Sequence, residues 1–187
     1  MKVYVVRHGE SETNEGGKWT GWFDAKLTQK GIEDAKKAAA ILKDVKFDKI
    51  YASDLKRAQQ TAENAIPNCE YEVLPLIKEI DVGRLENTLI SDLTDEQRIN
   101  GLENGYSEFG GESREQFYKR IEKTMKMLEQ QNFENVALFS HGGWLHGILN
   151  LALETKIARH KVCCNNCTVA VFEYTNKNWR LYSWINF

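Results

Sequence analysis

The chain has 187 residues, of which 42% are hydrophobic and 28% charged, and its formal net charge is −2. This composition predicts one globular domain spanning residues 1–187 with a core of sizeable volume. The charge provides no positive field for nucleic acid, and no apolar run approaches the ~20 residues of a membrane helix, so we expect neither partner and a cytoplasmic location.

Short apolar runs alternate with amphipathic helical patterns along the chain. Thr28 is expected to cap the first long helix, and Ser113 with Gln116 forms a capping-box pattern at a later one. The predicted elements are a strand at 2–6, a helix from 28, a strand at 48–53, helices at 54–66 and 113–131, a strand at 135–139, a helix at 144–153, and strands at 167–175 and 179–187.

This alternation predicts an α/β fold. We expect a three-layer sandwich in which a mostly parallel central sheet carries helices on both faces. The two C-terminal strands, separated by the turn-prone residues 176–178, add an antiparallel element at one edge. The stretch 87–110 is less regular and is interpreted as a partly helical insertion over one edge of the sheet.

Polar residues follow three of the predicted strands, at the points where the chain leaves the core. In open α/β sheets, ligands collect outside the carboxyl ends of the strands, where helix N-termini favour anions. We therefore expect the three exits to point at one site. Their residues are Arg7, His8, Gly9, Glu10, Ser11 and Asn14 after the first strand, Ser53, Asp54 and Arg57 after the second, and Ser140, His141, Gly142 and Gly143 after the third.

Arg57 falls in the first turn of its predicted helix, where a cation opposes the helix dipole at a cost of ~0.3–1 kcal/mol. Either the carboxylate of Asp54 or a bound oxyanion can compensate. A second arginine, Arg7, ends a neighbouring strand. It favours the oxyanion, because two guanidinium groups suit the oxygens of a phosphoryl group.

His8 and His141 each sit beside small residues at a strand exit. An isolated histidine in such a fold is more often a hydrogen-bonded structural residue than a catalyst. The small neighbours, however, let a ligand approach, and a neutral imidazole can attack phosphorus while nearby arginines keep it neutral. His146 lies about 140° around the helix from His141, so we expect a helix-surface role for it.

Cys164 and Cys167 have a spacing found in metal and redox sites. No second closely spaced cysteine pair exists to complete a four-ligand zinc site, and the segment runs directly into an apolar strand. We therefore expect this pair to be buried and unreactive, and all four cysteines, including Cys69 and Cys163, to be reduced thiols.

Six motifs occur in order along the chain: RHGESETN from Arg7, WTGWFDAKLTQKGIEDA from Trp19, SDLKRAQQTA from Ser53, KEIDVGRLEN from Lys78, GGES from Gly110 and SHGG from Ser140. In this order they resemble the histidine phosphatase superfamily, also called the phosphoglycerate mutase-like family, over nearly the whole chain. The departures are confined to Leu85 and Asn87, which stand where that family often has tryptophan and glycine.

The resemblance implies that His8 is a nucleophile that becomes a phosphohistidine, with no metal and no cofactor. Glu79 matches the acid that protonates the leaving oxygen and then activates water, although the residues alone leave Asp81 and Glu86 as rivals. The residues matched to the family's binding groups are Arg7, Arg57 and His141 for gripping the phosphoryl oxygens, and Asn14, Ser11 and Gly142 for further substrate contacts.

We therefore expect a phosphatase that hydrolyses a small phosphorylated metabolite through this intermediate. Two alternatives stay open: a phosphoglycerate mutase-type enzyme, which returns the phosphoryl group to its substrate, and a non-catalytic regulator that only binds phosphoryl groups. The sequence selects neither the ester nor an oligomeric state. Five aromatic residues can rim the site or belong to the core, and the core is preferred: Trp19, Trp22, Phe23, Tyr106 and Phe109.

Overall fold

A six-stranded sheet forms the centre of the computed structural model, which describes residues 1–187 except the side chains of Ile99, Asn100 and Leu102. Across the sheet, the strands lie in the order β4 (Glu72–Val73), β3 (Lys49–Ala52), β6 (Asn135–Ser140), β1 (Lys2–Arg7), β7 (Val169–Thr175) and β8 (Asn178–Ile185). The first four are parallel, whereas β7 is antiparallel to both of its neighbours. The mostly parallel sheet with an antiparallel C-terminal edge is therefore confirmed.

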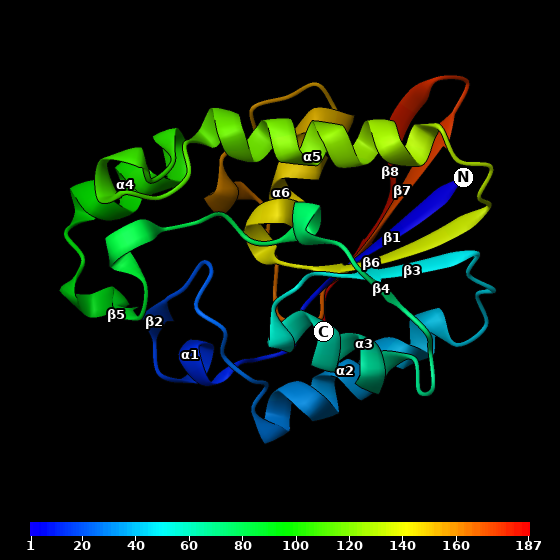
Figure 1. The fold of residues 1–187 in the computed structure, drawn as a ribbon, viewed down its shortest axis with the longest axis horizontal. Coiled ribbons are helices and arrows are strands. Elements are labelled where there is room, and N and C mark those ends of the chain that lie inside the picture. Colours follow the sequence, from blue (N-terminus) through cyan, green and yellow to red (C-terminus); the bar gives the residue numbers. More distant parts are fainter.

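Helices cover both faces of this sheet, which confirms the three-layer arrangement. In Figure 1, α5 (Arg114–Glu129) and α6 (Gly142–Ala152) lie on one face, and α2 (Gln29–Leu42) and α3 (Lys56–Ala65) lie on the other. None of the described helices is both long enough and apolar enough to span a membrane.

Side-chain caps fix two of the predicted helix starts. The hydroxyl of Thr28 accepts a hydrogen bond from the Gly31 amide at 3.0 Å, at the start of α2. At α5, the Gln116 amide donates to the Ser113 hydroxyl at 3.1 Å, and the Ser113 amide donates to the Gln116 side chain at 2.8 Å. The capping-box prediction is therefore confirmed, because amides that would otherwise lack partners are satisfied locally.

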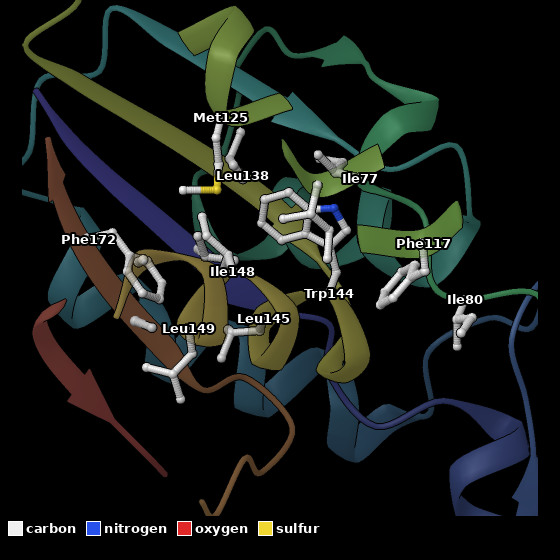
Figure 2. Close-up of a cluster of buried hydrophobic side chains, with 14 of the residues drawn as sticks. Ile77, Ile80, Phe117, Met125, Leu138, Trp144, Leu145, Ile148, Leu149 and Phe172 are labelled. Atoms are coloured by element: carbon white, nitrogen blue, oxygen red, sulfur yellow. The ribbon is translucent and has the colours of Figure 1, made fainter. Parts of the chain in front are cut away.

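The core consists of two layers, one on each face of the sheet. In β1, Val3 and Val5 pack with the α5 and α6 side chains, and Val6 packs with those of α2 and α3. Figure 2 shows the first layer, in which Trp144 and Ile148 of α6 pack against the sheet. Nearly all of α6 is buried, as its apolar sequence requires.

The segment 87–110 lies beyond the carboxyl ends of the central strands (Figure 1), not along a sheet edge as expected. It is partly helical, as predicted, and one of its strands pairs with the chain that follows the first motif. It therefore helps to enclose the region where the polar exits meet. The elements of this region and of the remaining loops are α1 (Glu12–Glu15), β2 (Lys18–Trp19), β5 (Thr88–Leu89), α4 (Asp95–Asn104) and the 3-10 turns η1 (Pro75–Ile77), η2 (Gly83–Leu85), η3 (Ile90–Asp92), η4 (Ser107–Phe109) and η5 (Arg159–Lys161).

Candidate active site

The first and third strand exits meet at a pair of buried histidines. His8 follows β1, His141 caps α6, and their ring centroids lie 5.2 Å apart with an angle of 59° between the rings. The parallel pairing of β1 with β6 causes this proximity, because it places Arg7 opposite Ser140. The His8 amide also donates to the Ser140 carbonyl at 2.9 Å. The structure thus brings together the two histidines that the sequence singles out.

Hydrogen bonding holds the His8 ring in one tautomer. Its Nδ1 lies 2.7 Å from the carbonyl oxygen of Gly9. A carbonyl can only accept, so Nδ1 carries the proton and Nε2 keeps its lone pair. Burial, assisted by the charges of Arg57 and Arg7, holds the pKa of His8 well below its usual range. His8 is therefore a neutral imidazole at neutral pH, with Nε2 available as a nucleophile.

Arg57 is almost completely buried, with 1% of its surface exposed. Its guanidinium donates to the carbonyls of Gly21 and Phe23 at 2.7 and 2.8 Å. Asp54 instead pairs with Lys78 at 2.9 Å, so compensation of Arg57 by an Asp54 ion pair is wrong. Burial lowers the pKa of Arg57 to about 10, which leaves it charged at neutral pH. A buried cation whose hydrogen bonds, among the described residues, go to carbonyls favours an anion as its ligand.

Glu86 supports Arg57 from the other side of the same loop. Its carboxylate accepts hydrogen bonds from the amides of Gly21, Trp22 and Phe23 at 3.1, 2.5 and 3.1 Å. The carbonyls of this loop are the ones that hold Arg57. Glu86 therefore positions the loop that holds Arg57, and this role argues against Glu86 as the alternative to Glu79 for the general acid.

Glu79 lies against the N-terminus of α6 and is 7% exposed. Its Oε1 accepts from the Ile80 amide and its Oε2 from the Gly143 amide, each at 2.9 Å. A Cβ atom on Gly143 would lie 2.2 Å from Oε1, so this contact requires glycine. Asp81, the other rival, accepts the Gly83 amide at 2.8 Å and closes a turn. Of the three sequence candidates, Glu79 alone lines the cavity described below.

Arg120 on α5 fixes the segment that carries Glu79. Its guanidinium donates to the carbonyls of Leu76, Lys78 and Glu79 at 2.9, 2.8 and 3.1 Å. It also binds both carboxylate oxygens of Glu112, at 2.8 and 2.7 Å. Glu112 belongs to the GGES motif, so that motif is linked to the Glu79 segment through Arg120. The sequence interpretation did not assign Arg120, because nothing local links α5 to residues 76–79.

A cavity of about 170 Å³ lies at the convergence of these groups. Of the eight residues matched to catalytic or substrate-binding roles, His141 and Gly142 stand outside its lining. His141 is completely buried, with Nε2 2.9 Å from the Ser53 hydroxyl and Nδ1 without a hydrogen-bond partner in the described part of the chain. The lining residues are Arg7, His8, Ser11, Thr13, Asn14, Lys18, Trp19, Thr20, Arg57, Glu79, Ile80, Val82, Ile90, Tyr106 and Arg159.

Ser11 and Asn14 form the capping box of α1 at the cavity wall. The Asn14 amide donates to the Ser11 hydroxyl at 3.4 Å, and the Ser11 amide donates to Asn14 Oδ1 at 3.2 Å. Asn166 donates to the same Oδ1 at 3.2 Å and to the His8 carbonyl at 3.1 Å. These bonds orient Asn14 so that its Nδ2 group is the one left to contact a ligand.

The cysteine-rich segment 163–167 lies behind the first motif. The carbonyl of Cys164 accepts a hydrogen bond from the Arg7 guanidinium, and the Cys167 amide donates to the His8 carbonyl at 3.2 Å. Cys167 is buried, as expected, and burial raises the pKa of its thiol to about 12. Cys164 is only partly buried, so the prediction that both cysteines of this pair are buried is wrong for Cys164. Cys163 is exposed. Among the described side chains, no group of three histidine, cysteine or acidic residues forms a metal-binding cluster.

Arg159 is a site residue that the sequence interpretation missed. It lies on η5 and lines the cavity, and a Cβ on Gly142 would lie 3.2 Å from its Nη2. Burial is the main cause that lowers the pKa of Arg7, and the charge of Arg159 adds to it. No motif surrounds Arg159, so only the path of the loop after α6 places it here.

The prediction for His146 is wrong. His146 is 8% exposed and lines a second cavity instead of a helix surface. The helical pitch correctly turns it away from His141, but α6 is buried nearly throughout, so the far side of the helix is also covered. The chain at 155–160 and α5 contribute to that cover.

The aromatic residues divide between core and surface. Tyr106 is buried, and Trp19 and Phe109 pack against the core. Trp22 and Phe23 are 41% and 44% exposed, so the prediction that they belong to the core is wrong for these two residues. Trp19 and Tyr106 also line the cavity.

Comparison with known proteins finds relatives that match nearly the whole chain. Residues 3–186 match the family model described as Histidine phosphatase superfamily (branch 1). A protein of Enterobacter sp. (strain 638) named "Probable phosphoglycerate mutase GpmB" is 30% identical over 195 residues, covering 99% of this chain and 90% of that protein. The alpha-ribazole phosphatase structure from Shigella flexneri has a TM-score of 0.85 at 26% identity, covering 97% of this chain and 94% of that chain. The phosphoserine phosphatase structure from Entamoeba histolytica, in complex with 3-phosphoglyceric acid, has a TM-score of 0.83 at 28% identity, covering 100% of this chain and 97% of that chain.

Proposed function

Because the chain belongs to the histidine phosphatase superfamily, we propose that it hydrolyses a small phosphomonoester metabolite, without a metal ion, through a covalent phosphohistidine on His8. The observation that carries this proposal is the cavity that neutral His8 shares with Arg7, Arg57 and Glu79. Phosphoryl transfer needs a nucleophile, cations for the phosphoryl oxygens and a group that protonates the departing oxygen, and these residues can supply them.

In the first step, Nε2 of His8 attacks phosphorus, and the bond from phosphorus to the alcohol oxygen breaks. Glu79 gives its carboxyl proton to that oxygen, so the alcohol leaves neutral. Arg7 and Arg57 neutralise the phosphoryl oxygens. The bond from Nδ1–H to the Gly9 carbonyl stabilises the positive charge that develops on the ring.

In the second step, the phosphohistidine is hydrolysed. Glu79, now a carboxylate, takes a proton from a water molecule while the water oxygen attacks phosphorus. The bond between phosphorus and Nε2 breaks, inorganic phosphate forms, and His8 returns to its neutral tautomer. The same carboxyl group thus acts as acid and then as base, and backbone amides at both of its oxygens hold it in position.

Phosphoglycerate mutase-type transfer is the second candidate, and the name of the Enterobacter relative favours it. It uses the same phosphohistidine but returns the phosphoryl group to a hydroxyl of the substrate. The two functions differ in one measurable product, which is inorganic phosphate.

The test is to incubate the purified chain briefly with a labile phosphate ester in the presence of a chelator, then to follow acid-labile label on His8 and release of inorganic phosphate. We expect both in the native chain and neither in His8→Ala. Glu79→Gln should slow turnover by ~10²–10⁴-fold, whereas Asp81→Asn, a matched change two residues away, should stay within about twofold.

Three outcomes would contradict this proposal. Full activity in His8→Ala excludes the phosphohistidine. Interchange of phosphoglycerate isomers that outpaces phosphate release favours the mutase. Tight vanadate binding without turnover of any ester favours the non-catalytic regulator.

A further inference from the structure

Thr61 on α3 is a completely buried residue that has no role in the steps above. Its hydroxyl donates to the Arg57 carbonyl at 2.6 Å and accepts a hydrogen bond from the Gly9 amide at 3.0 Å. A hydroxyl has one proton, so that proton points to the Arg57 carbonyl and a lone pair faces the Gly9 amide. Thr61 thereby joins the first turn of α3 to the backbone that follows β1, although Gly9 and Thr61 are 52 positions apart.

Gly9 is the residue whose carbonyl holds the His8 ring. The carbonyl oxygen lies 2.7 Å from His8 Nδ1. A Cβ on Gly9 would lie 2.4 Å from the carbonyl oxygen of Gly31, so close packing against α2 requires glycine at this position. Glycine restricts its own backbone torsions less than any other residue. Contacts with other parts of the chain must therefore set the direction of the Gly9 carbonyl.

The peptide between His8 and Gly9 is held at both of its polar atoms. The His8 carbonyl accepts from the Cys167 amide at 3.2 Å and from the Asn166 side chain at 3.1 Å. The Gly9 amide, at the other side of the same peptide, donates to Thr61. A buried amide without an acceptor is costly, so loss of the Thr61 hydroxyl favours rotation of this peptide toward another partner. Such a rotation changes the direction of the Gly9 carbonyl.

The tautomer of His8 depends on this carbonyl. With the proton on Nδ1, Nε2 keeps the lone pair that attacks phosphorus. When the bond to the carbonyl weakens, the proton can occupy Nε2 instead, and Nε2 is then no nucleophile. The same carbonyl faces the positive charge that the ring acquires as Nε2 bonds to phosphorus, so its position also affects the stability of the transition state.

We propose that Thr61 is a positioning residue for the nucleophile: its hydroxyl fixes the Gly9 peptide so that the Gly9 carbonyl keeps the proton of His8 on Nδ1. This inference rests on the proposed function, which makes His8 the nucleophile. Thr61 stands outside the lining of the cavity, so it acts through Gly9 and not on the substrate.

Three variants test this role. Thr61→Val keeps the branched shape and removes the hydroxyl, whereas Thr61→Ser keeps the hydroxyl. Thr124→Val is the matched control, because Thr124 on α5 is also completely buried and its hydroxyl also donates to the carbonyl four residues earlier, at 3.1 Å. Of the two threonines, Thr61 is the one that also accepts the Gly9 amide.

The first measurement needs no substrate. Nitrogen-15 NMR distinguishes a protonated from an unprotonated ring nitrogen, and the His8 signals are those missing from His8→Ala. Near neutral pH, we expect the Nδ1–H tautomer in the native chain, in Thr61→Ser and in Thr124→Val. In Thr61→Val, we expect a clear population of the Nε2–H tautomer.

The second measurement is the rate at which label from a labile phosphate ester appears on His8 in a single turnover. Thr61→Val should slow this rate by about 10-fold to 10²-fold, because a nucleophile in the wrong tautomer or orientation reacts slowly. Thr61→Ser and Thr124→Val should stay within about threefold of the native rate. The affinity for inorganic phosphate, which reports on the arginines, should change by less than about twofold in each variant. Thermal unfolding checks that each variant is folded at the assay temperature, and a merely destabilising change would not alter the tautomer.

Three results would overturn the inference: a native tautomer and labelling rate in Thr61→Val, equal slowing by Thr61→Val and Thr124→Val, or loss of the Nδ1–H tautomer in Thr61→Ser. A native chain that places no label on His8 fails at the proposed function instead. The tautomer comparison still decides in that case whether Thr61 holds the ring.

Discussion

The Gly143 amide and the Glu79 carboxylate form a contact that leaves no room for a side chain. The amide donates to Oε2 at 2.9 Å, and a Cβ at position 143 would lie 2.2 Å from Oε1. This contact joins the N-terminus of α6 to the segment after η1, which are distant in sequence. The second glycine of the SHGG motif is thus explained by its contact with Glu79.

We predict that Gly143→Ala lowers kcat by about 10²-fold, because the new methyl group displaces Glu79 from its position as general acid. Steady-state kinetics, with thermal unfolding to check the fold, measures this. Gly142→Ala is the matched comparison, since a Cβ there meets the flexible end of Arg159 first, at 3.2 Å. If the two variants lose activity equally, the contact with Glu79 does not explain the sensitivity.

Arg120→Lys should lower kcat while the KM changes little. Lysine keeps the charge but cannot bind the carbonyls of Leu76, Lys78 and Glu79 together with both oxygens of Glu112. We expect a loss of about 10-fold to 10²-fold in kcat, because a misplaced acid transfers its proton poorly. The pH profile of kcat should also change, which a purely structural role would not produce. An unaltered profile and rate would contradict the positioning role.

Arg159→Met should raise KM by about fivefold to tenfold with a smaller effect on kcat, since Arg159 is an exposed residue that lines the cavity and is expected to bind the substrate rather than to react. Lys161→Met, on the same 3-10 turn but outside both cavities, is the control. An equal KM for Arg159→Met and the native chain would show that Arg159 does not contact the substrate.

Stability should fall on acidification below about pH 6.5. Burial holds the pKa values of His8 and His141 well below their usual range and that of His146 at about 4. Histidine has a pKa of ~6.5 in the unfolded chain. At pH values between this pKa and the lowered pKa values of the folded state, the unfolded state binds more protons, so the free energy of unfolding decreases as the pH falls. Each buried histidine lowers the free energy of unfolding by up to ~1.4 kcal/mol per pH unit in this range, and none changes it at a pH well above ~6.5.

Urea denaturation at pH 7, 6 and 5 checks this dependence. His146→Phe should reduce the slope by about one proton, because it removes one buried titrating group. His160→Gln, at an exposed position, is the matched control and should keep the native slope. A native chain that is equally stable at pH 7 and pH 5 would contradict the burial of neutral histidines.

The local patterns of the sequence were sufficient to predict the fold and to place most residues of the candidate site. Hydrophobic periods predict strands and helices because burial acts on each element separately, and caps such as Ser113 with Gln116 are contacts between near neighbours. The exits after β1 and β6 could be placed together because parallel strands end at the same side of a sheet.

The tertiary structure alone decided the groups that act across the chain. Arg120 and Glu79 are 41 positions apart, and no local pattern couples a helix face to a loop carbonyl. Arg159 and Glu86 likewise reach the site through the paths of loops. The burial of His146 depends on what covers the far side of α6. A residue's neighbours along the chain determine its periodicity and caps, whereas its burial, charge partners and pKa depend on atoms that only folding brings near.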